Sequence, residues 1–405
     1  MSFYPSEKIQ KRLLRTVKSH GTPLYVYNGD QIKHQYRRFE DAFDFKNVEI
    51  HFAAKALTNM RILQLLKSLG AGLDAVSIQE VKMGLMAGFT PEDIIFTPSG
   101  IGIDEYKEAI DLGVRINIDN LEVLEYFGLH FKGLPIGIRI NPHVMAGGNP
   151  KISVGHMDSK FGISVYQMPM VHRLVESLGL RIEGLHMHTG SDILDIGAFL
   201  QASEILFGVA ESFEDLSYLD FGSGFKVAYR ENDIETDIEE LGKALSQRFK
   251  TFCTAYGKDL KLILEPGKYL VSNSGYFLVK ANWIKQTTSN VFAQVDSGFN
   301  HLIRPMFYGA HHEILNLSNT GEKSRVYSIT GYICETDTFA VNRVIPEISS
   351  GDILCFLNAG AYGFAMSSNY NSRLRPAEVL LEGKDGMTLI RKRESLEDLL
   401  RLQVF

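Results

Sequence analysis

The sequence is poor in cysteine and lacks the marks of secreted, membrane or nucleic-acid-binding proteins. Its three cysteines, Cys253, Cys334 and Cys355, form no disulfide framework and no metal-ligand spacing. No apolar run is long enough to span a bilayer, and the N-terminus lacks the apolar stretch of a signal peptide. A net charge of −6 disfavours nucleic acid and anionic membranes as partners. We therefore expect a reduced, cytoplasmic enzyme or binding protein.

The length and the hydrophobic content indicate a globular chain of two domains. Single hydrophobic cores stop growing at roughly 250–300 residues, and this chain has 405. A hydrophobic content of 45% with 22% charged residues is ordinary for such proteins. No low-complexity segment or long linker interrupts the sequence.

Short β-branched runs alternate with amphipathic segments between residues 25 and 275, and several of these segments end on glycine. The alternation predicts an N-terminal parallel (β/α)8 barrel of the TIM type. A doubly wound open sheet is the alternative, but eight regular repeats favour closure. The eight predicted strands lie within residues 48–55, 72–77, 93–99, 114–120, 135–141, 182–190, 218–224 and 260–267.

The pattern changes after residue 275, where strand-like runs are joined by turns rather than helices. We predict a second, β-rich domain of sandwich or barrel type, formed by residues 1–24 and 276–405, that completes the active site. A strand over 22–28 is expected to pair with this domain, and a short helix is expected to start at Ser395. The predicted strands lie within residues 275–287, 290–298, 324–334, 351–360 and 377–393.

Chemically active residues gather where the predicted barrel strands end. In such barrels the carboxyl ends of the strands form the active-site face. The residues expected at that rim are Lys55, Asp74, Ser77, Asn141, His186, His188, Ser191, Gly222, Ser223, Gly224, Glu265, Gly267 and Lys268.

These residues suit pyridoxal 5′-phosphate. Lys55 would bond covalently to the cofactor aldehyde, and the turn Gly222–Gly224 would bring backbone N–H groups to its phosphate. Glu265 would hold the ring nitrogen in its protonated form, and His188 would stack on the ring. Lys55 has no carboxylate near it in sequence, and we interpret this isolation as what keeps its amine nucleophilic.

A metal-dependent hydrolase is the rival interpretation, because His186 and His188 could lie on one face of a strand. The other predicted strands carry no further histidine cluster at the rim. The pair His311–His312 lies in the second domain without partner spacing. We therefore predict no metal.

Motifs in both domains resemble the diaminopimelate decarboxylase family, which belongs to the alanine-racemase-like (fold type III) pyridoxal-phosphate enzymes. "FAAKA", "HMHTGS", "DFGSGF", "EPGK", "RPMFY", "CETDTF" and "GAYGFAMSSNYNSRLRPAEVL" occur in the family's order and spacing. The last run is the most specific, since related ornithine and arginine decarboxylases differ there. The resemblance implies decarboxylation of meso-2,6-diaminopimelate to L-lysine and CO2 by a homodimer with shared active sites.

The resemblance also implies a role for each matched residue. Lys55 and Cys334 are expected to be catalytic, Cys334 as the proton donor supplied by the partner subunit. The cofactor would be held by Lys55, Asp74, His188, Ser191, Gly222, Ser223, Gly224, Glu265, Gly267, Lys268 and Tyr362. The substrate would be bound by Lys268, Arg304, Tyr308, Glu335 and Tyr362, with Arg304 and Tyr308 on a carboxylate and Glu335 on the distal amine.

Two departures from the family pattern stand out. Lys268 replaces an arginine and so loses the bidentate fork of a guanidinium. Ser223 stands in the middle of a usually all-glycine triplet, where its hydroxyl could add a donor to phosphate. The glycine-containing segment 141–162 is expected to be a lid over the substrate.

Three alternatives stay open. Decarboxylation of ornithine, arginine or a carboxylated polyamine such as carboxynorspermidine would leave Arg304 without a distal carboxylate. A non-catalytic pyridoxal-phosphate-binding protein would not need Cys334 and Glu335. A racemase would need a second base opposite Lys55, and no tyrosine is clearly placed for that role.

Overall fold

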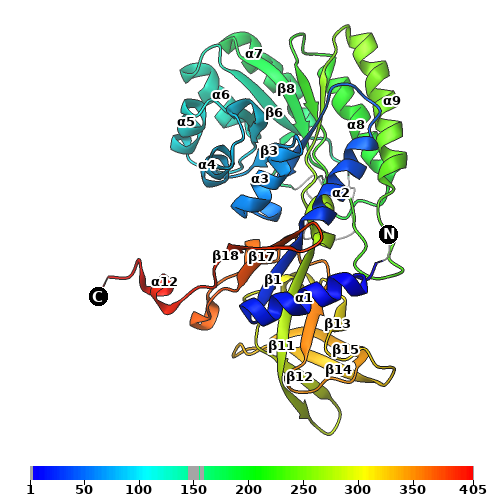
Figure 1. Ribbon diagram of the computed structural model, residues 1–405. Helices are drawn as coiled ribbons and strands as arrows, with labels where there is room; N and C mark the ends of the chain where they lie inside the picture. Colours follow the sequence, from blue (N-terminus) through cyan, green and yellow to red (C-terminus); the bar gives the residue numbers. More distant parts are fainter. Residues whose placement is uncertain (1–2, 145–154, 156–158, 405) are drawn as a thin grey trace. The chain divides into compact units, whose positions relative to one another are not determined.

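The structure is a computed structural model that describes residues 3–144, 155 and 159–404. Its contacts divide the chain into two compact units (Figure 1). The barrel unit comprises Lys33–Val227 and Ile234–Leu270, and the β-rich unit comprises Met1–Ile32, Ala228–Asp233 and Val271–Phe405. The middle of the segment predicted to be a lid lies outside the described residues.

Within the described residues of the barrel unit, eight parallel strands close into a barrel, which confirms the predicted fold class. Closure comes from two pairings, β10 with β2 and β5 with β6. A two-residue strand, β7 (Ile163–Ser164), pairs beside β6. In their order around the barrel the strands are β2 (Val48–Ala53), β3 (Gly72–Ala75), β4 (Ile94–Phe96), β5 (Arg115–Ile118), β6 (Pro135–Asn141), β8 (Arg181–Met187), β9 (Tyr218–Asp220) and β10 (Lys261–Leu264).

Helices follow the barrel strands, and their ends match local sequence signals. Ser77 caps the start of α4 by accepting the Glu80 N–H at 3.2 Å. Gly179 and Gly257 end two helices in the left-handed conformation. Helix α2 (Gly29–Asp41) precedes the first barrel strand, and the helices after it are α3 (Met60–Ser68), α4 (Ile78–Ala87), α5 (Ile103–Asp111), α6 (Leu121–His130), α7 (Met168–Leu178), α8 (Ile196–Ala210), α9 (Ile238–Tyr256) and α10 (Lys268–Val271).

A tyrosine from β9 fills the barrel interior. Tyr218 is 1% exposed, and its hydroxyl donates to Asn117 Oδ1 at 3.0 Å. A Cβ at Gly184, on the neighbouring strand β8, would lie 2.1 Å from the Tyr218 ring, so only glycine fits there. The interior is therefore a packed core, and the polar groups at the strand ends are left for chemistry.

The β-rich unit is built on a mixed sheet in the order β15-β14-β12-β11-β1-β17-β18, and β16 joins β11 to β13. The predicted N-terminal strand is present as β1, which pairs antiparallel with β11 and parallel with β17. The strands are β1 (Leu24–Asn28), β11 (Gly275–Gln286), β12 (Val291–Val295), β13 (Ile314–Asn316), β14 (Ser324–Thr330), β15 (Thr338–Pro346), β16 (Ile353–Phe356), β17 (Ala377–Glu382) and β18 (Gly386–Arg391).

Three α-helices lie wholly within the described residues of the β-rich unit: α1 (Glu7–His20), α11 (Arg304–Tyr308) and α12 (Leu396–Leu400). Helix α1 packs through Leu13 on a core that includes Leu24 and Val379. The predicted C-terminal helix is confirmed as α12, with Ser395 as its N-cap. No helix in the described part of the chain has the length and apolarity needed to cross a bilayer.

Candidate active site

Lys55 and Asp74 form an ion pair at the carboxyl ends of two adjacent barrel strands. Lys55 follows β2 in a single 3-10 turn, Ala54–Ala56. The register pairs Ala53 with Asp74, and Lys55 Nζ lies 2.7 Å from Asp74 Oδ2. The prediction that Lys55 stands away from any carboxylate is therefore wrong. Adjacent parallel strands bring together residues that lie far apart in sequence.

The pair is asymmetric in exposure. The Lys55 side chain is 38% exposed, whereas that of Asp74 is 2% exposed. Burial and the charge of Glu265 raise the pKa of Asp74, while Lys55 opposes that rise. Asp74 thus anchors Lys55 from the protein side, and the amine stays reachable from outside.

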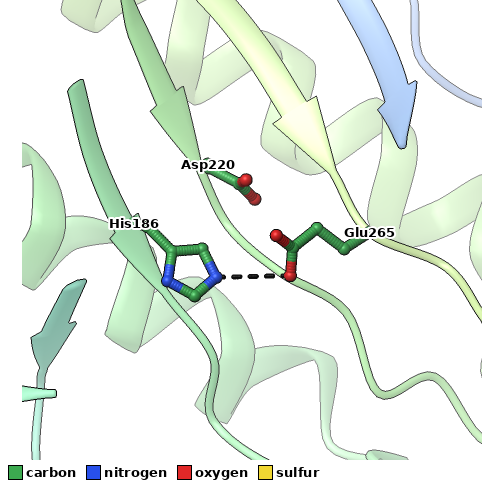
Figure 2. A group of neighbouring side chains, drawn as sticks. All are labelled: His186, Asp220 and Glu265. Carbon is green, nitrogen blue, oxygen red and sulfur yellow. Dashed lines mark hydrogen bonds and ion pairs between the residues drawn. The ribbon is translucent and has the colours of Figure 1, made fainter. Parts of the chain in front are cut away.

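A buried cluster of His186, Asp220 and Glu265 lies across the ends of β8, β9 and β10 (Figure 2). His186 Nε2 is 3.2 Å from Glu265 Oε2. Polar atoms of the three side chains all lie within 4.8 Å of one another. Asp220 Oδ1 also accepts the Gly222 N–H at 2.9 Å, which ties the cluster to the glycine turn.

The two carboxyl groups of this cluster have opposite electrostatic tendencies. Burial opposes ionisation of Glu265, yet His186, Lys55 and His188 hold its pKa well below the ordinary value. Burial and the charge of Glu265 raise the pKa of Asp220 well above its ordinary value. The surroundings therefore favour the negative charge of the cluster on Glu265 and the proton on Asp220.

The described geometry separates the two histidines that a metal-dependent hydrolase would use together. His186 turns to Glu265, and His188 Nδ1 instead accepts the Ser223 N–H at 3.4 Å. Burial, with Arg139 and Lys55 nearby, holds the pKa of His188 well below its ordinary value, so its imidazole is neutral. His186, Asp220 and Glu265 are donors that a metal could use, but the contact between His186 and Glu265 already gives His186 Nε2 a partner.

The turn after β9 needs its glycines. Gly222 and Gly224 have φ of +60° and +120°. A Cβ at Gly224 would lie 1.9 Å from the Gly190 carbonyl oxygen. The hydroxyl of Ser223 donates to the Glu265 carbonyl oxygen at 2.6 Å. This hydrogen bond joins the turn after β9 to the loop after β10.

Lys268 is buried and engaged at the loop after β8. Its side chain is 7% exposed, its Nζ lies 3.0 Å from Ser191 Oγ, and it forms an ion pair with Asp192. The ion pair compensates the charge of Lys268. The preceding residue, Gly267, is closely packed. A Cβ atom at Gly267 would lie 3.0 Å from the Cβ atom of Ala53.

In the β-rich unit, Arg304 and Tyr308 lie four residues apart on α11, which places them on one helix face. Arg304 is 8% exposed. Among the described residues, no carboxylate forms an ion pair with Arg304, and its Nε has no hydrogen-bond acceptor. A buried guanidinium in this state is suited to an anionic ligand.

Cys334 and Glu335 are exposed and lie beyond the end of β14. The Cys334 thiol lies 3.1 Å from Asn371 Nδ2, and Tyr370 donates its hydroxyl to Glu335. Tyr362 is half-buried with φ of +56°, a left-handed conformation unusual for tyrosine.

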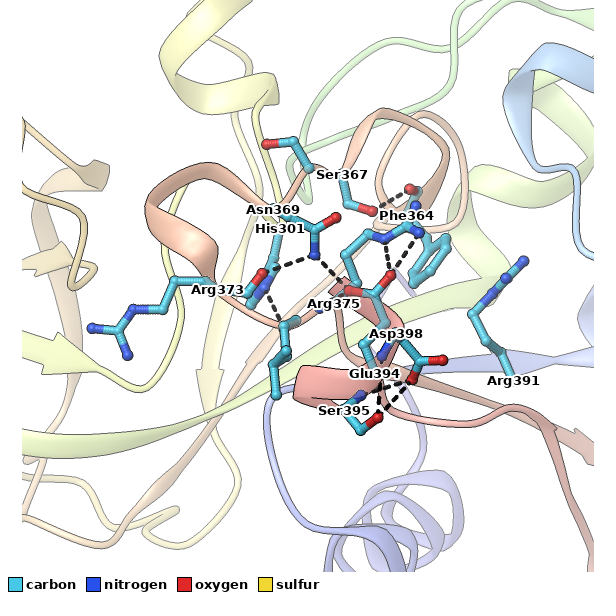
Figure 3. Close-up of polar contacts among 12 residues, drawn as sticks. His301, Phe364, Ser367, Asn369, Arg373, Arg375, Arg391, Glu394, Ser395 and Asp398 are labelled. Carbon is cyan, nitrogen blue, oxygen red and sulfur yellow. Dashed lines mark hydrogen bonds and ion pairs between the residues drawn. The ribbon is translucent and has the colours of Figure 1, made fainter. Parts of the chain in front are cut away.

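A polar network holds the chain segment that follows Tyr362 (Figure 3). Glu394 accepts from Arg375 Nε at 2.6 Å and from Asn369 Nδ2 at 2.5 Å. His301 Nε2 lies 3.0 Å from the Leu374 carbonyl oxygen. The segment that carries the most specific family motif is thus fixed by buried or half-buried polar contacts rather than by strand pairing.

Comparisons with known proteins agree with this arrangement. The model of the pyridoxal-dependent decarboxylase, pyridoxal binding domain, matches residues 29–272. A diaminopimelate decarboxylase from Methanothermobacter thermautotrophicus is 40% identical over 396 residues, which cover 95% of this chain and 92% of the relative. One from Campylobacter jejuni is 37% identical and covers 94% and 96%.

This chain belongs to the diaminopimelate decarboxylase family. A crystal structure of the Helicobacter pylori enzyme complexed with L-lysine matches with a TM-score of 0.89 and 32% identity, covering 96% of this chain and 99% of that one. A diaminopimelate decarboxylase from M. jannaschii, also in complex with L-lysine, matches with a TM-score of 0.87 and 30% identity, covering 97% of this chain and 94% of that one.

The residues of the barrel rim fit the pyridoxal phosphate cofactor of the family. Glu265 Oε1 is buried without a hydrogen-bond partner among the described residues, as a carboxylate kept for a ring N–H would be. A side chain at Gly222 or Gly224 would collide with neighbouring atoms, so this turn offers backbone alone at those two positions. Lys55 supplies the one amine that the covalent bond requires.

Several polar residues of this candidate site could not be assigned from the sequence. Asp220, Asp192 and the Glu265 contact of His186 were not assigned, and neither was Arg139, which is 7% exposed inside the barrel. Asp220 stands directly before the glycine turn that had been singled out. Its position at the end of a predicted strand was the available signal.

Proposed function

We propose that this chain converts meso-2,6-diaminopimelate to L-lysine and CO2. One observation favours this substrate over ornithine or arginine: Arg304 is buried and forms no ion pair with a described carboxylate. A substrate with a second carboxylate would satisfy that cation, and the other substrates would leave it bare. The relatives named diaminopimelate decarboxylase support the same choice.

We propose that the barrel unit holds the cofactor. Lys55 would bond to it covalently, Asp74 would orient Lys55, His188 would pack on the ring and Glu265 would accept the ring N–H. Ser191, Gly222, Ser223, Gly224, Gly267, Lys268 and Tyr362 would surround the phosphate. When bound, pyridoxal phosphate supplies a protonated ring that accepts the electron pair released as CO2 departs.

The β-rich unit would recognise the substrate. Arg304 and Tyr308 would bind the carboxylate that is retained, and Glu335 would accept the distal ammonium. Tyr362 would border the substrate, as would Lys268 from the barrel unit. Cys334 would deliver a proton to the carbon that has lost CO2, because a thiol is a competent general acid near neutral pH. We propose that residues 1–24 and 276–405 form this domain and complete the site.

We infer that the enzyme acts as a cytoplasmic homodimer in which Cys334 and Glu335 serve the partner subunit's site. Both residues are exposed on the single chain, whereas a proton donor works best where water is excluded. The test mixes subunits carrying Lys55→Ala with subunits carrying Cys334→Ala. Random pairing of two inactive forms should restore about a quarter of the wild-type activity, because half of the dimers then have one intact site. No recovery would overturn the shared site.

The activity itself is tested by incubating the purified protein with pyridoxal phosphate and the separate isomers of diaminopimelate. Lysine and CO2 should form from the meso isomer. Ornithine and arginine serve as controls, because putrescine or agmatine formation would replace this proposal with a polyamine-type decarboxylase. Cofactor binding without any of these products would favour a non-catalytic binding protein.

A further inference from the structure

The guanidinium of Arg304 rests on an aromatic ring instead of an acid. Its Cζ lies 5.2 Å from the centroid of the Tyr229 ring, and both side chains are nine-tenths buried. A cation above a tyrosine face is attracted by the ring quadrupole, and the attraction grows as water is removed. The ring therefore holds Arg304 without cancelling its charge.

Tyr229 is itself held from two sides. Its hydroxyl lies 3.1 Å from Ser272 Oγ. The His312 ring meets it edge-on, with centroids 5.6 Å apart and planes at 89°. His312 Nδ1 lies 2.9 Å from the Leu357 carbonyl oxygen, so that nitrogen carries the proton. Burial and the nearby Arg304 lower the pKa of His312 to about 3, which keeps this second ring neutral.

Tyr229 lies in a short segment, Ala228–Asp233, that belongs to the β-rich unit. In sequence, however, this segment follows the barrel strand β9 and its glycine turn. Asn358 Nδ2 donates to the Ala228 carbonyl at 2.8 Å, and Asp233 Oδ2 accepts the Tyr229 N–H at 3.2 Å. The segment is thus fastened where its tyrosine supports Arg304.

We propose that Tyr229 is a positioning residue for substrate specificity: its ring fixes the Arg304 guanidinium for the retained carboxylate of the substrate and leaves that cation uncompensated. This inference rests on the proposed function, since it takes Arg304 as the carboxylate anchor. Lys268 and Arg391, by contrast, are paired with the acids Asp192 and Glu378. An acid in the place of Tyr229 would compete with the substrate for Arg304.

The test measures L-lysine binding to the cofactor-loaded enzyme by calorimetry, together with kcat and KM for meso-diaminopimelate. Tyr229→Leu removes the ring face and should weaken lysine binding roughly threefold to thirtyfold, the span expected for one cation–π contact. KM should rise by a similar factor, and kcat should change much less. Tyr229→Phe keeps the ring and should bind lysine like the wild type.

Two further variants distinguish a failure of the role proposed for Arg304 from a failure of the role proposed for Tyr229. Arg304→Gln should weaken lysine binding more than Tyr229→Leu does. If Arg304→Gln leaves lysine binding unchanged, the role of Arg304 in the proposed function fails. If Arg304→Gln weakens binding but Tyr229→Leu does not, only the present inference fails. Tyr276→Leu is the matched control, because Tyr276 is buried in the core of the same unit; it should lower the melting temperature without changing the lysine Kd.

A graded series guards against loss of folding in Tyr229→Leu. Phenylalanine analogues carrying one, two or three ring fluorines at position 229 keep the ring shape and progressively weaken its quadrupole. The lysine Kd should rise step by step along the series. A Kd that stays constant across the series would overturn the proposal.

Discussion

The two units hold their proposed functional groups in different ways. In the barrel unit each charged group has an opposite or proton-sharing partner: Lys55 has Asp74, Lys268 has Asp192 and Glu265 has His186. In the β-rich unit the partners are neutral: Arg304 lies on Tyr229, Glu335 accepts from Tyr370 and Cys334 contacts Asn371. Paired charges are suited to a site that holds a permanently bound cofactor. A charged residue with a neutral partner can still form an ion pair with a ligand that binds and dissociates.

The largest effect should come from breaking the first barrel pair. Lys55→Ala should lower activity by on the order of a thousandfold or more, because no other amine replaces the nucleophile. Lys55→Arg is the matched control, since it keeps a cation beside Asp74 but cannot bond to the aldehyde. Borohydride reduction followed by peptide mass spectrometry should find the cofactor on Lys55 in the wild type and on no peptide in either variant. An adduct at another lysine would contradict the assignment.

The next effect compares the two acids of the buried cluster. Glu265→Gln removes the ionised carboxylate and should lower kcat on the order of a hundredfold. Asp220→Asn should be tolerated, because asparagine imitates a protonated acid and still accepts the Gly222 N–H. Asp220→Ala leaves that N–H unpaired and should cost about 1–3 kcal/mol of unfolding free energy. Equal losses of kcat in Asp220→Asn and Glu265→Gln would show that the division of charge is wrong.

A smaller effect should come from the β-rich unit. Cys334→Ala should slow turnover about a hundredfold, within the range of general acid catalysis. Cofactor affinity, followed by absorbance titration of the apo-protein, should stay close to the wild-type value, because every proposed cofactor group except Tyr362 lies in the barrel unit. Cys355→Ala removes a fully buried thiol and is the control for general loss of stability. Unchanged turnover in Cys334→Ala would reject its role as proton donor.

The smallest expected effect is on the pH dependence of stability, and it involves His301, a buried neutral histidine of the β-rich unit. Burial lowers the pKa of His301 from 6.5 to about 4. Between these values the unfolded chain binds the proton and the folded chain does not. Protonation of His301 therefore does not lower the unfolding free energy above pH 6.5. As the pH falls from 6.5 towards 4 that free energy decreases, by about 2 kcal/mol between pH 6.5 and 5. Denaturant unfolding at several pH values should show a shallower slope in His301→Gln than in the wild type; identical slopes would contradict the prediction.

The barrel could be predicted almost completely, because each strand is a short apolar run closed by a turn signal and followed by helical spacing. The β-rich unit was predicted less well, since β13 and β15 were missed. Strand β13 spans only Ile314–Asn316. Strand β15 is exposed at several central positions, so its apolar residues do not alternate cleanly. Edge and half-exposed strands carry weak patterns in sequence.

The site could be predicted where a residue type is typical of one chemical role. Lys55 and the turn Gly222–Gly224 are such cases. Pairings could not be predicted, because they depend on strand register. The Lys55–Asp74 ion pair follows from Ala53 lying opposite Asp74, and the Tyr229–Arg304 contact joins residues from separate parts of the chain. The sequence alone supplies neither neighbour.

The position of β1 has a consequence for how the protein is made. Its five residues pair with β11 on one side and with β17 on the other. A ribosome therefore completes every barrel strand before either neighbour of β1 has been synthesised. The apolar run Leu24–Tyr27 must wait, exposed to chaperones and to other nascent chains, while the barrel is free to close beside it. Strand β1 is thus made before every barrel strand, yet it finds both of its partners only after the last of them.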